Sequence, residues 1–154
     1  MMAAASSMID FRATIIAEAR GWIGTPYRHQ GADKQIGCDC LGLVRGIWRE
    51  IYGSDAEVPA AYASGWAVAD RDETLLKGAS RHLEPKQLDA MAPGDVLAFR
   101  WRPNLPAKHC GILVSGNRMV HAYESAGRVA EGALHPLWRK RIAGVFSFPV
   151  PGGD

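Results

Sequence analysis

The chain has 154 residues, of which 47% are hydrophobic, and its formal net charge is +2 at pH 7. This length and composition indicate a single domain with a buried core, and so small a net charge gives no support to nucleic-acid binding. The charge is uneven, because residues 1–95 carry 10 basic and 13 acidic side chains whereas residues 96–154 carry 8 and 3. The C-terminal part is therefore expected to present a positive surface, facing either solvent or an acidic substrate.

The three cysteines, Cys38, Cys40 and Cys110, do not form a disulfide framework. They indicate free thiols and a reducing place of synthesis. Residues 1–8 lack the basic and apolar segments of a signal peptide, and no stretch is long and apolar enough to span a membrane. We therefore expect a protein that is made in the cytoplasm without a signal peptide and has no membrane span.

The first half of the sequence predicts two helices. Residues 1–9 are expected to form a disordered tail, and a helix capped by Asp10 should run to about Ile23. After an irregular loop rich in glycine and polar residues, a second helix is expected from Cys40 to a stop near Gly53.

The second half predicts mainly strands. The expected elements, in chain order, are a loop over residues 53–68 with Pro59, Tyr62 and Trp66, a helix over about 72–82, and strands over 96–101, 109–114, 119–123 and 142–148. A Gly-Asn turn at residues 116–117 should join the second and third strands as a hairpin. Helices followed by an antiparallel sheet are typical of the α+β class, here one domain over residues 10–149 with a tail over 150–154.

Cys40 is the residue with the clearest chemical potential. Asp39 is a good N-cap, which places Cys40 in the first turn of its helix, where unpaired N–H groups and the helix dipole favour a thiolate. Cysteines in such positions have lowered pKa values and are nucleophilic. A buried cysteine that merely packs is the commoner case, so a catalytic role requires a base nearby.

Two histidines on neighbouring strands are candidates for that base and for the group that orients it. A two-residue turn would pair Ile112 with His121 and His109 with Glu124. His109 and His121 would then be offset by roughly 10 Å along the strands. Contact between them therefore requires a bulge or a strong twist, and Glu124 is an alternative orienting group.

A zinc site is a competing use of the same cysteines and histidines. The spacing argues against it, because Cys38 and Cys40 form a Cys-x-Cys pair rather than the usual knuckle. His109 and Cys110 are adjacent, so they would point to opposite faces of a strand. We therefore expect neither a metal nor another cofactor.

Several motifs, in this order, resemble those of the NlpC-type cell-wall cysteine peptidases, and the match covers about residues 12–148. They are Gly24-Thr25-Pro26-Tyr27, Asp39-Cys40-Leu41-Gly42-Leu43-Val44, His109-Cys110-Gly111-Ile112 and Val120-His121-Ala122. The longer wording is similar to peptidases encoded beside phage-tail and gene-transfer-agent genes, through Arg45-Gly46, Ala107-Lys108-His109 and Trp138-Arg139-Lys140-Arg141.

The resemblance implies a papain-like fold with N-terminal helices packed on an antiparallel sheet. It implies Cys40 as nucleophile, His109 as base and His121, rather than Glu124, as the orienting residue. The oxyanion would be held by Tyr27 and the Cys40 N–H, with Asp39 close by. Apart from the resemblance, Arg28 follows Tyr27 and Lys108 precedes His109, so both are expected either as cations that bind substrate at the rim of the cleft or as solvated surface residues. Many relatives have serine after the nucleophile, so Leu41 removes one polar contact to substrate.

The implied activity is hydrolysis of peptidoglycan stem peptides between γ-D-glutamate and diaminopimelate. We expect the enzyme to act at the cell wall as part of a phage tail or tail-like particle, with tail proteins as partners. The alternatives are a non-hydrolytic tail-tip module that binds the wall, and an amidase or acyltransferase on the same scaffold.

Overall fold

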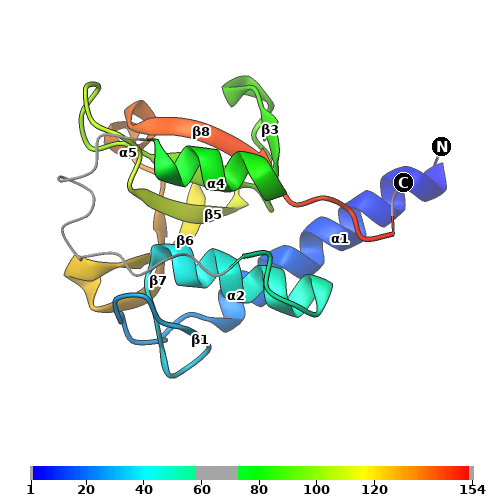
Figure 1. The fold of residues 1–154 in the computed structure, drawn as a ribbon. Helices are drawn as coiled ribbons and strands as arrows, with labels where there is room; N and C mark the ends of the chain where they lie inside the picture. Colours follow the sequence, from blue (N-terminus) through cyan, green and yellow to red (C-terminus); the bar gives the residue numbers. More distant parts are fainter. Residues whose placement is uncertain (1, 58–72, 153–154) are drawn as a thin grey trace.

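The computed structural model describes residues 2–57 and 73–152 and shows helices packed on a six-stranded antiparallel sheet (Figure 1). The strand order is β3-β8-β4-β5-β6-β7. Its strands are β3 (Glu84–Lys86), β4 (Val96–Phe99), β5 (His109–Ser115), β6 (Arg118–Tyr123), β7 (Arg128–Ala133) and β8 (Ile142–Ser147). The α+β class and the helix-first order are confirmed.

The remaining described elements lie mainly around this sheet. The helices are α1 (Met2–Gly21), α2 (Cys40–Tyr52), α4 (Thr74–His82) and α5 (Pro136–Lys140), with 3-10 turns η1 (Leu88–Ala90) and η2 (Glu124–Ala126). A small separate sheet pairs β1 (Ala32–Asp33) with β2 (Gly37–Cys38). None of the described helices has the length and apolar composition needed to cross a membrane.

Helix α1 differs from its expected bounds. It begins at Met2 rather than at Asp10, so the segment expected as a disordered tail is helical and projects beyond the body of the domain (Figure 1). The three alanines at positions 3–5 have the highest helix propensity, which favours this extension. Buried Ile15, Ala19 and Trp22 attach the C-terminal half of α1 to the core.

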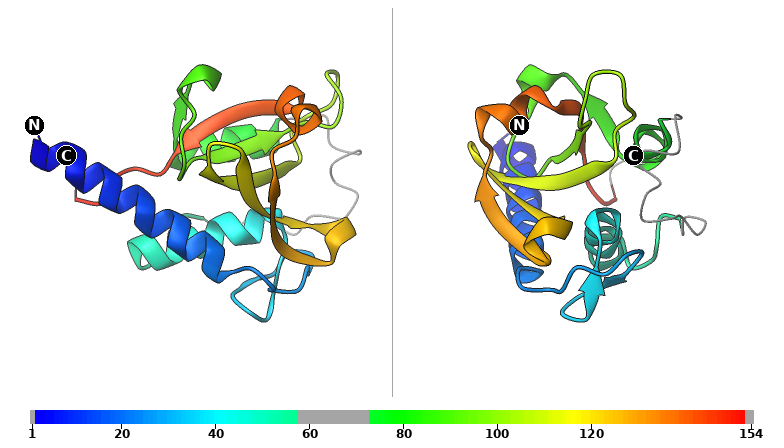
Figure 2. Two further views of the ribbon diagram at one scale, coloured as in Figure 1. Left: turned by 180° about the vertical axis from the view of Figure 1, so that it is seen from behind. Right: turned by 90° about the vertical axis from the view of Figure 1, so that its left-hand side faces the viewer.

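Helix α2 begins and ends where the sequence predicted. The Asp39 side chain accepts a hydrogen bond from the Gly42 N–H, and Gly53 ends the helix in the left-handed region at φ 85°. Buried Leu43 and Ile47 face the core, where α2 packs against α1, β5 and β6. Figure 2 shows the sheet curving round so that its β6–β7 end approaches the start of α2.

Both faces of the central strands are buried, because their side chains alternate between two apolar clusters. Cys110, Ile112 and Val120 face the larger cluster, which includes α1 and α2. Phe99 and Leu113 face the smaller cluster on the other side of the sheet, together with residues from the loops and α5. This explains the nearly continuous apolar runs of β4 and β5.

Other predicted bounds need correction. β4 ends at Phe99 rather than at residue 101, and β3, β7 and the short β1–β2 pair were not predicted. Of the loop expected over residues 53–68, the part with Pro59, Tyr62 and Trp66 lies outside the described residues, as does the expected start of the following helix. That helix ends at His82, as predicted.

Candidate active site

The start of α2 is fastened to the loop that precedes it through Asp39. One carboxylate oxygen of this residue accepts the Gly42 N–H at 2.8 Å, and the other accepts the Gln30 N–H at 2.7 Å. Gln30 has a φ of 62°, a conformation uncommon for residues other than glycine. Asp39 therefore fixes both the cap and the loop, and it holds Cys40 at the first position of the helix.

Gly42 allows this loop to lie against the helix. A Cβ at this position would come within 1.7 Å of the Gly31 carbonyl oxygen, a backbone atom that no side-chain rotation can move. The Asp39 N–H also donates to that carbonyl at 3.2 Å. The close packing leaves Cys40 9% exposed, which keeps its thiol at the edge of the core.

The two histidines meet because the β5–β6 hairpin contains a bulge. Ile112 pairs with Val120 and not with His121, since the register shifts between Leu113 and Ser115. Gly111 consequently lies beside His121, where a Cβ would approach the Cβ of His121 to 3.0 Å. The predicted register was wrong, and the bulge on which histidine contact depended is present.

The contact between the histidines is a buried hydrogen bond. His109 Nε2 lies 2.8 Å from His121 Nδ1, and the two residues are 4% and 8% exposed. Glu124, the alternative orienting group, lies on exposed η2. The geometry therefore joins His109 to His121.

The charge states of this pair follow from burial. Burial and then the charge of His109 lower the pKa of His121 to about 3, so His121 is neutral near pH 7. A neutral ring with its proton on Nε2 accepts the Nε2–H of His109 through Nδ1. This leaves Nδ1 of His109 as the nitrogen that can bond to a thiol.

Cys40 lies near the His109–His121 pair. Its Sγ lies 3.9 Å from the carbonyl oxygen of Lys108, the residue directly before His109. A hydrogen bond from Cys110 and the bond and charge of His109 hold the pKa of Cys40 well below its usual range, although burial opposes them. Cys40 is therefore suited to exist as a thiolate beside a cationic imidazole.

Cys110 also reaches Cys40, which its position in sequence did not suggest. Its Sγ lies 3.3 Å from the Cys40 carbonyl oxygen and acts as the donor. His109 and Cys110 do face different apolar clusters, since His109 stacks near Phe99 while Cys110 belongs to the α2 cluster. Helix α2, which begins at Cys40, packs against β5, so His109 and Cys110 at the start of that strand are both near Cys40.

Aromatic side chains enclose the histidines, and the sequence reading missed this role. Trp101 stacks on His109 with ring centroids 5.6 Å apart, and Tyr123 stacks on His121 at 5.4 Å. Trp138 contacts both rings, at 5.7 and 5.5 Å. The packed rings limit access of water and restrict rotation of the imidazoles, so this enclosure fixes the orientation of His109. In the sequence, Trp138 belongs to one of the motifs that carry the family resemblance, which could have indicated its place near the histidines.

Tyr27 pairs with a residue that lies two positions before Cys40. It forms a parallel bridge with Cys38, and its N–H donates to the Gly127 carbonyl oxygen at 2.8 Å. Burial and then the charge of Cys40 raise the pKa of Tyr27, so its hydroxyl remains protonated and can donate a hydrogen bond. This is the property that an oxyanion-binding residue needs.

The two expected rim cations differ in their surroundings. Arg28 is exposed, next to Tyr27, and its side chain covers Gly37. Lys108 is only 5% exposed, so it is not the exposed rim residue that was expected. Its charge is felt by Glu73, whose carboxylate accepts hydrogen bonds from the Ala107 N–H and from Arg100. Lys108 therefore faces the interior on the side of Glu73.

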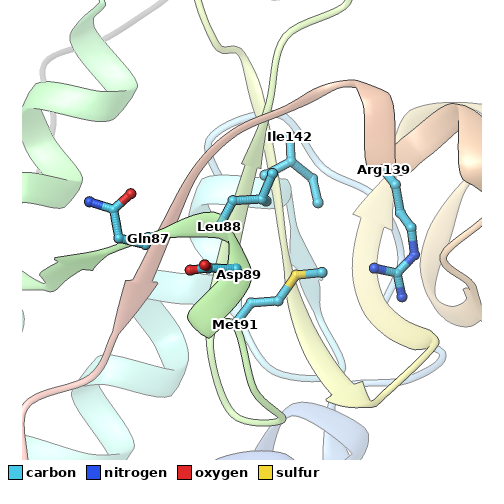
Figure 3. Close-up of a pocket in the computed structure, with 6 residues that line it drawn as sticks. All are labelled: Gln87, Leu88, Asp89, Met91, Arg139 and Ile142. Atoms are coloured by element: carbon cyan, nitrogen blue, oxygen red, sulfur yellow. The ribbon is translucent and has the colours of Figure 1, made fainter.

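Two further features bear on ligands. Within residues 2–57 and 73–152, no three or more metal-binding side chains come close enough to hold a metal ion. A pocket of about 480 Å³ lies beside β8 (Figure 3), and its lining contains none of the candidate site residues. It is lined by Gln87, Leu88, Asp89, Met91, Arg139 and Ile142.

Known proteins are similar to this chain in sequence. The murein DD-endopeptidase MepS/murein LD-carboxypeptidase of Escherichia coli K12 is 29% identical over 133 residues, covering 86% of this chain and 61% of that protein. The gamma-DL-glutamyl hydrolase of Bacillus subtilis is 25% identical over 134 residues, covering 87% of this chain and 29% of that protein. The chain thus spans about three fifths of the first relative and less than a third of the second.

Solved structures support the fold. An NlpC/P60 family protein from Bacillus cereus superimposes with a TM-score of 0.67 at 19% identity, covering 91% of this chain and 40% of that one. The NlpC/p60 domain of the peptidoglycan hydrolase SagA gives 0.61 at 23% identity, covering 89% of this chain and 98% of that one. These similarities confirm the papain-like architecture. Since the model of the NlpC/P60 family matches residues 24–147, which include Cys40, His109 and His121, the chain belongs to that family.

Proposed function

We propose that this chain is a cysteine peptidase that hydrolyses peptide bonds in the bacterial cell wall. The observation that carries the proposal is the buried hydrogen bond between His109 Nε2 and His121 Nδ1, 2.8 Å long, beside a Cys40 whose pKa Cys110 and His109 lower. A nucleophile, a base and a neutral orienting group are the parts that acyl transfer requires. The family membership and the names of the relatives support the same assignment.

The mechanism that follows has two stages. The Cys40 thiolate attacks the carbonyl carbon of the scissile amide, and the developing oxyanion receives hydrogen bonds from the Tyr27 hydroxyl and the Cys40 N–H. His109 gives its proton to the leaving amine as the C–N bond breaks. In the second stage His109 takes a proton from water, the hydroxide attacks the thioester, and the released sulfur returns to its thiolate form.

We propose the γ-D-glutamyl–diaminopimelate linkage of stem peptides as the bond that is cut. The names of two relatives support this choice, the gamma-DL-glutamyl hydrolase and the bifunctional muramidase/DL-endopeptidase CwlT of Bacillus subtilis. MepS carries the names of other linkages, so the bond has to be read from the reaction products. Exposed Arg28 is the candidate for binding a stem-peptide carboxylate, in a cleft where half-buried Leu41 offers no hydroxyl.

The proposed site of action is the cell wall, reached on a phage tail or tail-like particle. The support is the resemblance of the Ala107-Lys108-His109 and Trp138–Arg141 wording to tail-associated peptidases. In the proposed active site, Lys108 contributes its carbonyl oxygen, which faces the Cys40 sulfur. Its side chain is buried. Detection of the chain in purified particles by mass spectrometry tests this assignment.

Digestion of purified peptidoglycan tests the activity. The wild-type protein is expected to release fragments with a free D-glutamate γ-carboxyl and a free diaminopimelate amine, and Cys40→Ala should reduce this release to background. Cys38→Ala is the matched control, because Cys38 is fully buried and burial followed by the charge of Asp39 raises its pKa to about 12. Binding to the wall without turnover in the wild type would indicate a binding module, and transfer to an added amine would indicate an acyltransferase.

A further inference from the structure

The mechanism proposed above makes no use of Cys110, although this residue lies beside the nucleophile. Its side chain is 2% exposed, and its Sγ lies 3.3 Å from the Cys40 carbonyl oxygen. Cys110 comes from β5 and Cys40 from α2, so the contact joins the two elements that also bring the nucleophile to His109. A thiol at this point is a hydrogen-bond donor in a place that water does not reach.

The Cys40 carbonyl does not depend on this donor. Cys40 is the first residue of α2, and α-helical geometry directs its carbonyl to the N–H of Val44, one turn further on. The carbonyl oxygen has two lone pairs, so the Cys110 thiol is an additional and weak donor to it. A proton held so weakly is available to a stronger acceptor nearby.

The Cys40 sulfur is that stronger acceptor when it is ionised. The Cys110 Sγ already reaches the backbone of the same residue, 3.3 Å from the Cys40 carbonyl oxygen, and Cys110 is the largest influence that lowers the pKa of Cys40. The same contact, with burial, raises the pKa of Cys110 well above its usual value. One proton therefore stays on Cys110 while Cys40 carries the negative charge, and hydrogen bonds to a charged acceptor are the stronger ones.

We propose that Cys110 is a positioning residue that donates its S–H to the Cys40 thiolate and returns it to the Cys40 carbonyl when the sulfur is acylated. This role rests on the proposed peptidase function and extends it. No bond other than the hydrogen bond changes, because Cys110 keeps its proton in every step. The thiolate consequently has two donors, the His109 imidazolium and a neutral thiol, and it needs the imidazolium less than a thiolate with one donor would.

The test is the pH dependence of Cys40 alkylation, which requires no wall substrate. The rate of iodoacetamide labelling of the Cys40 peptide is measured by mass spectrometry from pH 3 to pH 9 in a Cys38→Ala background. Cys110→Ala removes the donor and should slow labelling below the midpoint by about tenfold, the effect of losing one hydrogen bond to a charged group. Cys110→Ser keeps a donor and should return the curve towards that of the parent.

Circular dichroism and thermal melting first establish that each variant is folded. If Cys110→Ala does not fold, Cys110→Val takes its place, since valine fills the space without a donor. The proposal is overturned if the variant without a donor labels like the parent, or if Cys110→Ser shifts as far as Cys110→Ala. A wild-type protein that fails to digest the wall yet shows the Ala–Ser difference would remove the proposed function and still support the hydrogen bond.

Discussion

His121 shows how the surroundings of one residue set its role. Burial and then the charge of His109 lower its pKa to about 3, so the ring is neutral wherever a Cys40 thiolate and a charged His109 coexist. A neutral acceptor orients His109 through one hydrogen bond without adding a charge. An aspartate in this place would attract the His109 proton more strongly and would require further donors to be buried. His121 therefore supplies direction rather than charge.

The first prediction concerns this orienting bond. His121→Ala should lower kcat/KM on a stem-peptide fragment by about 10²-fold, because His109 loses the partner that fixes its ring. His121→Asn should recover much of that loss, since its amide oxygen can accept the same hydrogen bond. Glu124→Ala is the control and should match the parent, as Glu124 is exposed. Loss of activity in Glu124→Ala but not in His121→Ala would reverse the assignment.

At the scale of elements, the start of α2 depends on packing of backbone against backbone. The loop from Arg28 to Asp39 lies on the first turn of the helix and is held by the Asp39 carboxylate and by the Gly31 carbonyl. Isolated Tyr27–Cys38 and Pro26–Arg128 bridges connect the two residues before this loop to β2 and to the start of β7. Cys40, the proposed nucleophile, and Tyr27, the proposed oxyanion donor, thus share one support.

Gly42→Ala tests this support. The added Cβ would meet the Gly31 carbonyl oxygen at 1.7 Å, so the loop must shift away from the helix. We expect a loss of about 1–3 kcal/mol in the free energy of unfolding and a fall in kcat/KM of about 10²-fold, because Tyr27 moves relative to Cys40. Chemical denaturation and fragment hydrolysis measure the two effects.

Gly78→Ala is the matched control in α4. Its Cβ would meet only the end of the flexible Arg81 side chain, at 3.4 Å. Replacing a helical glycine by alanine without a clash should stabilise the fold by about 0.4–1 kcal/mol and leave activity unchanged. Equal gains in stability in the two variants would mean that helix propensity alone decides and that the close approach of Gly42 to the Gly31 carbonyl is unimportant.

The sequence predicted local elements better than it predicted long-range pairing. Asp39 and Gly53 mark both ends of α2 through capping chemistry that acts within a few residues, and these bounds were confirmed. The hairpin register was wrong because the Gly116-Asn117 signal is the same with or without an extra residue at Val114. β7 was missed because Arg128–Ala133 has no regular apolar alternation and is a strand by pairing with β6.

The candidate site was predicted unevenly for the same reason. Cys40 stands out because helix capping is a local signal, and His109 and His121 stand out as titratable residues on adjacent strands. The stacking of Trp101 and Tyr123 on the two histidines and the contact between Cys110 and Cys40 depend on how the sheet curves round α2. Side-chain type and spacing do not encode that curvature.

At the scale of the whole molecule, the positive C-terminal part is less available to a substrate than its charge count suggested. Arg100 pairs with Glu73 at 2.8 Å and Arg118 pairs with Glu131 at 2.8 Å. Arg141 lies over the Trp101 ring, 5.8 Å from its centroid, and Lys108 is buried. Much of this positive charge therefore serves local contacts within the domain rather than an open surface.

Asp95 connects the beginning, middle and end of the chain. Its side chain is fully buried and pairs with Arg12 of α1 and Lys86 of β3, both at 2.9 Å. It also accepts hydrogen bonds from the Ser147 hydroxyl at 2.7 Å and from the Ala92 N–H at 2.8 Å. All the acceptor capacity of this carboxylate is thus used by four different parts of the fold.

Asp95→Ala should lower the free energy of unfolding by about 3–5 kcal/mol, because it leaves two partly buried cations and a partly buried hydroxyl without their common acceptor. Urea denaturation of the folded domain measures this loss, which is a large fraction of the stability of a small protein. Glu131→Ala is the control, since it removes a carboxylate that also binds two cations, Arg20 and Arg118, but does so at the surface. Exposed pairs contribute about 0.2–1 kcal/mol, so Glu131→Ala should cost much less. Comparable losses in both variants would show that burial of the Asp95 network adds nothing to its contribution.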